Sequence, residues 1–263
     1  MTSTVPLYAG YIFDLDGTVY LGDELIPGAE NTVAALSARG VGITFVSNKP
    51  IATGRSYAEK LTRLGIAADV EHVLTSPMAL AHYISAHHET PHVLVLGEEP
   101  VLSELRVIGC RIVQSAADAE IVVISWDRQV TYGRLDEAFQ ALRRGAFFYV
   151  TNPDVTCPLA GGSEVSDAGA VMAYMEACSG RTPDHIAGKP SPALAHVAMA
   201  RMGTTPEETL LIGDRLDTDL VCGKSAGCAT ATVLSGVTDA ADLAALPADC
   251  RPDYVLGSIA ELL

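Results

Sequence analysis

Short apolar runs alternate with segments of helical spacing toward both ends of the chain. The runs are of strand length, and the segments between them carry apolar residues every three or four positions. The runs lie at 11–13, 43–46, 209–213 and 230–236, and the helical segments at 28–40, 56–65, 191–203 and 219–227. This order, with short glycine-rich joints, predicts a parallel sheet covered by helices on both faces. We therefore expect an α/β fold with a doubly wound, Rossmann-like core.

The middle of the chain has an alternation of its own. Its apolar runs lie at 92–97, 121–125 and 147–151, and its helical segments at 100–109, 133–145 and 168–180. These elements suffice for a smaller α/β domain. The joints at 75–80 and 179–185 are rich in proline, glycine and polar residues, which is typical of domain boundaries. We therefore expect a core of residues 1–79 and 183–263, with a domain of residues 80–182 inserted into it.

Polar side chains follow four apolar runs that we assign to the core. They are Asp14 and Asp16 after 11–13, Ser47 and Asn48 after 43–46, Lys189 after 185–188, and Asp214 after 209–213. Each has an ordinary structural interpretation: a turn, a helix cap, a surface lysine or an acidic first turn of a helix. Ligands of open parallel sheets bind at the carboxyl ends of the strands, however. The ordered set therefore predicts a site at one edge of the sheet.

These strand ends resemble the motifs of a known superfamily. The segments are "DLDGTVY" (14–20), "VSNK" (46–49), "GKPSP" (188–192) and "GDRLDTD" (213–219). Together they resemble the four motifs of the haloacid dehalogenase superfamily of phosphotransferases. The form of the motifs, with "TNPD" (151–154), is similar to the p-nitrophenyl phosphatase and NagD-like branch, subfamily IIA. The resemblance implies a Mg²⁺-dependent phosphomonoesterase that acts on a small phosphorylated metabolite.

The resemblance assigns catalytic roles to residues at these positions. Asp14 would attack phosphorus and form an aspartyl-phosphate, and Asp16 would protonate the leaving oxygen and later deprotonate water. Mg²⁺ would be held by Asp14, Asp214 and the backbone carbonyl of Asp16, while Lys189 adds positive charge. Dehalogenases of the superfamily lack the second acid and the transporting ATPases have lysine there, so Asp16 favours phosphate-ester chemistry.

The remaining site residues would bind or orient these groups. Ser47, Asn48 and Lys49 are expected to contact the phosphate. Thr18 would orient Asp16, and Asp219 would orient Lys189 or a metal-bound water. In the inserted domain, Asn152 and Cys157 are the expected substrate contacts. Arg128 is an alternative anion ligand, although an exposed arginine is more often only solvated.

Two other functions share part of this pattern. A phosphomutase or phosphotransferase would use the same two acids but usually carries its cap between the first two motifs, where this chain has room for one helix. A non-catalytic phosphate-sensing module would be phosphorylated on Asp14, yet Asp16 and Lys189 are both present and disfavour that role. The long interval between Ser47 and Lys189 instead predicts a cap domain inserted there, which would close over the site and select the leaving group.

Composition narrows the class of partner. The chain has 263 residues, of which 49% are hydrophobic, and a formal net charge of −15. Such a charge argues against binding nucleic acid or an anionic membrane through a broad basic surface. The apolar runs are too short to span a membrane, no signal-like segment is evident, and the six cysteines form no CxxC pair. We expect a cytoplasmic protein with reduced thiols, for which a homodimer through the cap is left open.

Overall fold

The computed structural model describes residues 5–158 and 163–263, which form two compact units. The core unit comprises Met1–Ser47, Gly54–Leu74 and Lys189–Leu263, and the inserted unit comprises Asn48–Thr53 and Thr75–Gly188. The chain therefore passes between the units after residues 47, 53, 74 and 188. Helix α3 begins at Ser76 and has a proline in its first turn, a position that favours proline. Because the third crossing precedes Thr75, the whole helix belongs to the inserted unit.

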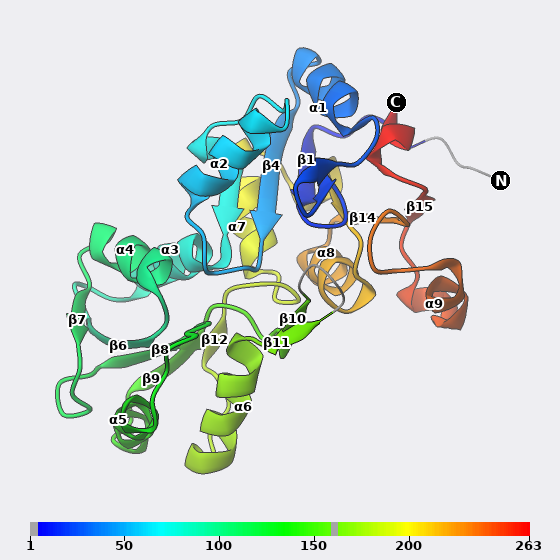
Figure 1. Ribbon diagram of the computed structural model, residues 1–263. Helices are drawn as coiled ribbons and strands as arrows, with labels where there is room; N and C mark the ends of the chain where they lie inside the picture. The colour runs from blue at the N-terminus through cyan, green and yellow to red at the C-terminus, as the bar shows by residue number, and fades with distance from the viewer. Residues whose placement is uncertain (1–4, 159–162) are drawn as a thin grey trace. The chain divides into compact units, whose positions relative to one another are not determined.

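A six-stranded sheet forms the centre of the core unit (Figure 1). Its strand order is β15-β14-β13-β1-β4-β5, and the pairings from β15 to β4 are parallel. The strands are β1 (Gly10–Asp14), β4 (Gly42–Ser47), β5 (Val73–Thr75), β13 (Thr209–Gly213), β14 (Ala229–Val233) and β15 (Tyr254–Leu256). The central strand β1 is buried throughout, which explains its unbroken apolar sequence before Asp14.

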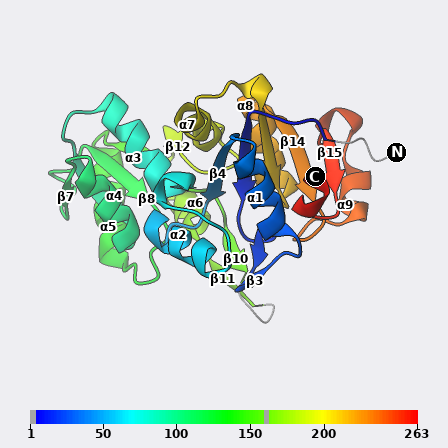
Figure 2. The ribbon, with the colours of Figure 1, turned by 90° about the horizontal axis from the view of Figure 1, so that it is seen from above.

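Helices cover both faces of this sheet. Figure 2 shows α1 (Ala29–Ala38) and α2 (Gly54–Arg63) on one face, and α7 (Ala193–Met202) and α8 (Val221–Ala226) on the other. In α2, Tyr57, Ala58 and Leu61 are buried at helical spacing. The other elements are β2 (Tyr20–Leu21), β3 (Glu24–Leu25), η1 (Val70–His72), η2 (Pro206–Glu208), the π-helical turn η3 (Leu216–Leu220), α9 (Ala240–Ala245), η4 (Ala248–Cys250) and η5 (Ile259–Leu262).

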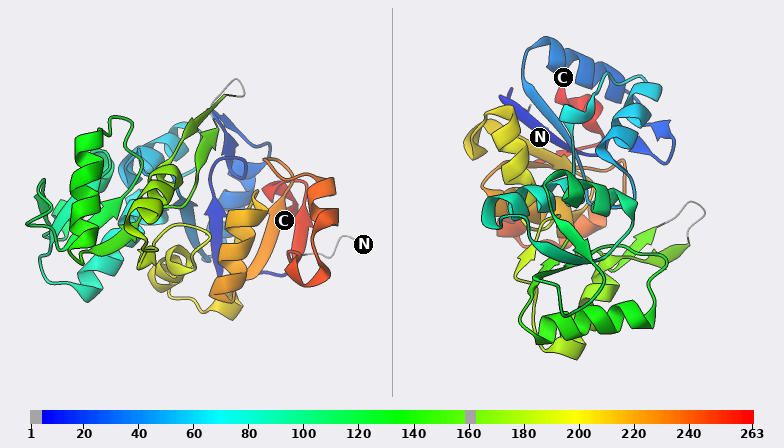
Figure 3. Two further views of the ribbon diagram at one scale, coloured as in Figure 1. Left: turned by 90° about the horizontal axis from the view of Figure 1, so that it is seen from below. Right: turned by 90° about the vertical axis from the view of Figure 1, so that its left-hand side faces the viewer.

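The inserted unit has a five-stranded parallel sheet of its own, ordered β12-β9-β8-β6-β7. Helices α3 and α4 lie on one face of it and α5 and α6 on the other (Figures 1 and 3). The elements are α3 (Ser76–His87), β6 (His92–Leu96), α4 (Glu99–Val107), β7 (Arg111–Val113), β8 (Ile121–Ile124), α5 (Tyr132–Arg143), β9 (Phe147–Val150), β10 (Thr156–Pro158), β11 (Glu164–Ser166), α6 (Ala168–Ser179) and β12 (His185–Ile186). Its core contains Leu94, Val122, Phe148 and Met175.

The fold class expected from the sequence is confirmed. The doubly wound α/β core and the second, smaller α/β unit are both present. The pattern did not predict the antiparallel pair β10–β11, and the single helix expected over 219–227 is instead η3 followed by α8. Among the described residues, no helix is long and apolar enough to cross a membrane.

Candidate active site

The register of the core sheet brings three acidic and polar strand ends together. Asp14 pairs with Val46, so Ser47 follows at the same edge, and Phe13 pairs with Ile212, two residues before Asp214. Parallel strands end at a common edge, and three of the four expected strand ends therefore converge in the core unit at Asp14, Ser47 and Asp214. The fourth expectation was wrong in its strand: the run at 185–188 contains β12, which pairs with β9 in the sheet of the inserted unit, and Lys189 is the first residue after the chain returns to the core unit.

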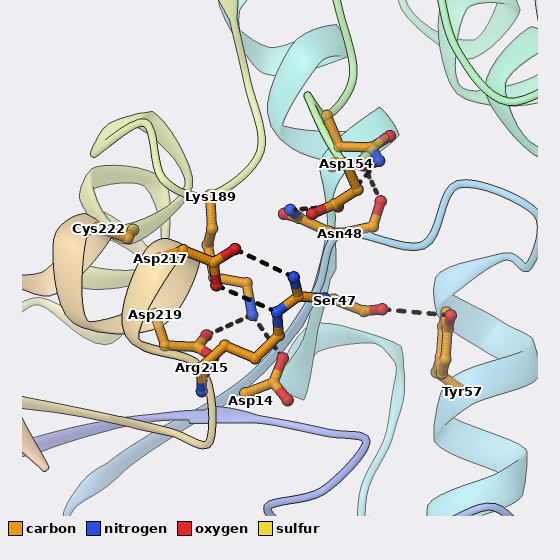
Figure 4. A network of polar contacts seen from close by, with 12 residues as sticks. Asp14, Ser47, Asn48, Tyr57, Asp154, Lys189, Arg215, Asp217, Asp219 and Cys222 are labelled. Carbon is orange, nitrogen blue, oxygen red and sulfur yellow. Dashed lines mark hydrogen bonds and ion pairs between the residues drawn. The ribbon is translucent and has the colours of Figure 1, made fainter. Parts of the chain in front are cut away.

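Lys189 lies between two carboxylates at this edge. Its Nζ is 2.5 Å from Oδ1 of Asp14 and 2.6 Å from Oδ1 of Asp219, as Figure 4 shows. The second oxygen of Asp219 accepts from the backbone N–H of Arg215 at 3.2 Å. All three side chains are buried, so the ammonium is neutralised at short range and its position is fixed by two acceptors.

Asp214 is held against two glycines. Its Oδ2 accepts from the backbone N–H of Val237 at 2.8 Å. A Cβ added at Gly17 would lie 2.4 Å from Asp214 Oδ2, and one added at Gly236 would lie 2.0 Å from it. Gly17 also has φ +89°, a conformation that side chains rarely adopt. The glycine behind the two acids of the first motif therefore gives Asp214 the space it occupies.

The excess of carboxylates shifts the pKa values of this cluster. Burial raises the pKa of Asp14 to about 8, with Asp219 and Asp214 adding to the rise and Lys189 opposing it. Burial and the charge of Asp219 raise the pKa of Asp214 to about 6. Burial alone would lower the pKa of Lys189, but Asp14 and Asp219 raise it well above its usual value. Three acids around one ammonium leave negative charge that a further cation would balance.

The donor set suits a hard divalent cation. Among the described residues, Asp14, Asp214 and Asp219 each offer a carboxylate oxygen within 4.8 Å of the others. Oxygen ligands of this kind are those that Mg²⁺ prefers. Asp219 already accepts from Lys189 and from a backbone N–H, so Asp14 and Asp214 are the better candidates for ligands. These two are the side-chain ligands expected from the sequence.

Ser47 has a partner that the sequence did not reveal. Its hydroxyl donates to the hydroxyl of Tyr57 at 3.2 Å, and both residues are 8% exposed. Tyr57 comes from the first half of α2, on the face that packs toward the sheet. The only available signal was a tyrosine on the apolar face of a predicted helix, and that pattern does not distinguish a core residue from a site residue.

Asp16 and Thr18 lie on the turn after β1. Asp16 is exposed and its Oδ1 accepts from the backbone N–H of Gly22 at 3.4 Å. The hydroxyl of Thr18 is buried and has no hydrogen-bond partner among the residues that the structure describes. The expected roles of Asp16 in proton transfer and of Thr18 in orienting it stay predictions.

The other expected substrate contacts belong to the inserted unit. Asn152 is fully buried and Cys157 is 3% exposed, packed with Trp126 and Ala168. Asn48 is half-buried and donates to Asp154, and Lys49 is half-buried beside it in sequence. The roles of these four residues as substrate contacts stay predictions.

Arg128 is engaged within the inserted unit. Its Nε and Nη2 donate to the two carboxylate oxygens of Glu98 at 2.7 and 2.6 Å. An anionic ligand of Arg128 would therefore compete with a bidentate carboxylate.

Comparisons with known proteins identify the family. A family model described as haloacid dehalogenase-like hydrolase matches residues 11–111, and one described as HAD-hydrolase-like matches 186–262. The chain is 34% identical to sugar-phosphatase AraL of Bacillus subtilis over 97% of this chain and 92% of that protein.

Solved structures agree. A p-nitrophenyl phosphatase from Archaeoglobus fulgidus superposes with a TM-score of 0.92 at 30% identity, covering 98% of both chains. A glycerol phosphate phosphatase from Mycobacterium tuberculosis, in complex with magnesium, gives 0.88 at 31% identity over 97% of this chain and 76% of that one. The chain therefore belongs to the haloacid dehalogenase-like hydrolases, in their p-nitrophenyl phosphatase and NagD-like branch, and is a phosphoric monoester hydrolase of that family.

Proposed function

We propose that the protein is a Mg²⁺-dependent phosphomonoesterase that hydrolyses a small organic phosphate through an aspartyl-phosphate on Asp14. The observation that carries the proposal is the placement of Lys189 between Asp14 and Asp219, with Asp214 close to both. A buried carboxylate at a sheet edge, aligned by a fixed ammonium, is the arrangement that nucleophilic attack on a phosphate dianion requires.

The chain's own residues divide the reaction between them. An oxygen of Asp14 attacks phosphorus while the ester P–O bond breaks, and Asp16 gives its proton to the departing oxygen. Asp16 then takes a proton from water, whose oxygen attacks phosphorus and releases inorganic phosphate and the Asp14 carboxylate. Lys189 and the Ser47 hydroxyl bind phosphate oxygens throughout.

A divalent cation would complete the charge balance. Mg²⁺ bound by Asp14, Asp214 and the backbone carbonyl of Asp16 would neutralise charge between the nucleophile and the phosphate. The acid cluster and the magnesium complex of the mycobacterial relative support this assignment. Bound cation would also favour the ionised form of Asp14, whose pKa burial raises.

The relatives support a class of substrate. The named relatives include a sugar-phosphatase and a glycerol phosphate phosphatase, which supports a small phosphorylated metabolite as the partner. The inserted unit is proposed to act as the cap that selects the leaving group. A cytoplasmic location and a homodimer through this unit belong to the same hypothesis.

One assay tests the proposal. Release of inorganic phosphate is measured for p-nitrophenyl phosphate and a panel of sugar, glycerol and nucleoside phosphates, with Mg²⁺ and after chelation by EDTA. We expect multiple turnovers that stop with EDTA and return with added Mg²⁺. A single stoichiometric phosphorylation without turnover would instead indicate a sensing module, and transfer of the phosphoryl group to a second hydroxyl without net phosphate release would indicate a mutase or phosphotransferase.

A further inference from the structure

Asn48 makes three close contacts within the inserted unit. Its Nδ2 donates to Oδ2 of Asp154 at 2.8 Å, and its backbone carbonyl accepts from the hydroxyl of Ser76 at 2.6 Å. Its Oδ1 lies against Gly188, where an added Cβ would come within 2.6 Å of that oxygen. Figure 4 shows the bond between Asn48 and Asp154. Asn48 is thereby fixed through its side chain and its backbone.

Asp154 is itself tied to the body of the inserted unit. The same Oδ2 also accepts from Nδ2 of Asn152 at 3.0 Å, and the backbone carbonyl of Asp154 accepts from the N–H of Gly169 in α6 at 2.8 Å. Asn152 is fully buried and is bonded in turn to Thr151 and Asp167. One carboxylate oxygen thus receives two amide donors and connects Asn48 to the sheet and to α6.

The residues in these contacts lie at or near the points where the chain passes from one unit to the other. Asn48 is the first residue after Ser47, and Gly188 is the last residue before Lys189. Gly188 is held by its own bond, from its N–H to the carbonyl of Thr151 at 2.7 Å. Ser76 follows the third crossing by two residues. The peptide groups adjoining Ser47 and Lys189 are therefore anchored to the same loop, residues 151–154.

We propose that Asp154 is a positioning residue of the phosphatase reaction, which sets the backbone next to Ser47 and Lys189 by holding Asn48. The inference rests on the proposed function, because it assumes that Ser47 and Lys189 contact the phosphate. An ionised acceptor holds two amides more firmly than a neutral one, and small displacements of phosphate-binding groups are costly in rate. It also gives the "TNPD" segment a role that needs no contact with substrate.

The test compares three variants with the wild-type enzyme. Asp154→Ala removes the acceptor, Asp154→Asn keeps an oxygen that is able to accept from both amides, and Asp167→Ala is the matched control. Asp167 also bonds Asn152 and caps α6 at Ala168, but it has no hydrogen bond to Asn48 among the described residues. For each protein one measures the melting temperature, kcat and KM for p-nitrophenyl phosphate, and the inhibition constant of inorganic phosphate.

We expect Asp154→Ala to lower kcat/KM by about ten- to hundredfold and to raise the inhibition constant of phosphate, because phosphate contacts are displaced. Asp154→Asn should have values of kcat/KM and of the phosphate inhibition constant close to those of the wild-type enzyme. Asp167→Ala should lower the melting temperature with little change in kcat/KM or in the phosphate inhibition constant. In an Asn48→Ala background, Asp154→Ala should have almost no further effect on kcat/KM.

Two results would overturn the inference in distinguishable ways. If the wild-type enzyme releases phosphate but Asp154→Ala and Asp167→Ala both change only the melting temperature, Asp154 has a purely structural role and the proposed function stands. If the wild-type enzyme releases no phosphate, the proposed function itself fails. Should Asp154→Ala not fold, Ser76→Ala replaces it, since it removes one hydroxyl at the same residue; it must lower kcat/KM in the same direction, to a smaller extent.

Discussion

The ammonium nitrogen of Lys189 lies 2.5 Å from Oδ1 of Asp14, and both side chains are withdrawn from solvent. The two residues are 175 positions apart in sequence and come from the first and the last of the three chain segments that make up the core unit. Because burial raises the pKa of Asp14 to about 8, the charge of Lys189 counts toward keeping this carboxylate ionised and ready to attack.

The first prediction concerns this carboxylate. Asp14→Asn is isosteric, but an amide is neither a nucleophile toward phosphate nor an anionic ligand. We expect kcat to fall by roughly 10⁴-fold or more while the circular dichroism spectrum is kept. Multiple turnover by the purified variant, after contaminating wild-type enzyme has been excluded, would remove Asp14 from the covalent role.

The second prediction uses the shifted pKa of Asp214. Its pKa in the folded protein is raised to about 6, so the folded state holds this proton more tightly than the unfolded state does. The resulting stabilisation is complete below the unfolded pKa, near 3.9, and is lost as the pH rises through 6. Without metal at pH 7.5, Asp214→Asn should therefore melt at a higher temperature than the wild-type protein, because it buries no charge there.

With Mg²⁺ present, the wild-type protein should instead melt at a higher temperature than Asp214→Asn. A ligand at about a hundred times its dissociation constant stabilises the folded state by about 2.7 kcal/mol, and Asp214→Asn should lose most of this gain. Asp16→Asn should keep it while losing kcat, since only its backbone carbonyl is expected to bind metal. Asp217→Asn is the control, because Asp217 is an exposed carboxylate on the same turn that pairs with Arg215. Equal Mg²⁺-dependent shifts in wild type and Asp214→Asn would exclude Asp214 as a ligand.

The third prediction concerns the hydroxyl of Tyr57. Tyr57→Phe keeps the packing of α2 and removes the hydroxyl that accepts from Ser47. A neutral hydrogen bond contributes about 0.5–1.5 kcal/mol, so we expect kcat/KM to fall about three- to tenfold with a matching rise in the inhibition constant of phosphate. The double variant Ser47→Ala/Tyr57→Phe should be no worse than Ser47→Ala.

Tyr254→Phe supplies the control for this experiment. Tyr254 also donates or accepts through its hydroxyl, to Tyr8 at 3.1 Å, but it begins β15, at the amino end of an outer strand. A loss of activity as large in Tyr254→Phe as in Tyr57→Phe would show that the effect is general and does not act through Ser47.

The meeting of Asp14 and Asp214 was predictable from sequence, because one rule decides where the ends of parallel strands lie. Parallel strands end at a common edge, so an acid after β1 and an acid after β13 must approach each other once the strand order is known. The resemblance of the motifs supplied the roles, and the family is confirmed.

Side-chain partners across elements were not predictable in this way. The hydroxyl of Tyr57 reaches Ser47 only because α2 packs on the sheet in a particular rotation. The bond from Asn48 to Asp154 joins residues 106 positions apart. Neither hydrogen bond leaves a periodic pattern in the sequence, because each depends on how separate elements pack together. The start of α3 was also not evident from composition. The helix begins at Ser76, before the boundary that composition indicated at residue 79.

The last prediction comes from a histidine that packs as an aromatic ring. His185 stacks on Tyr83 with ring centroids 3.6 Å apart, and its buried Nε2 has no hydrogen-bond partner among the described residues. Burial, with the nearby His87, lowers the pKa of His185 to about 4. The unfolded chain would bind this proton near pH 6.5, so the stabilisation is complete above that pH and is lost as the pH falls toward 4.

His185→Phe should therefore flatten the acid limb of the stability curve. The ring stack with Tyr83 is kept, while the group that must stay neutral is removed. At pH 5 the wild-type protein should have lost about 2 kcal/mol relative to pH 7.5 through His185 alone, and the variant should not show this part of the loss. Burial also lowers the pKa of His88, so some pH dependence will remain. Urea unfolding monitored at pH 7.5, 6 and 5 measures the difference, with the exposed His196→Phe as control. An acid limb as steep in His185→Phe as in the wild-type protein would mean that His185 is protonated in the folded state, and that its ring is not held neutral by the stack.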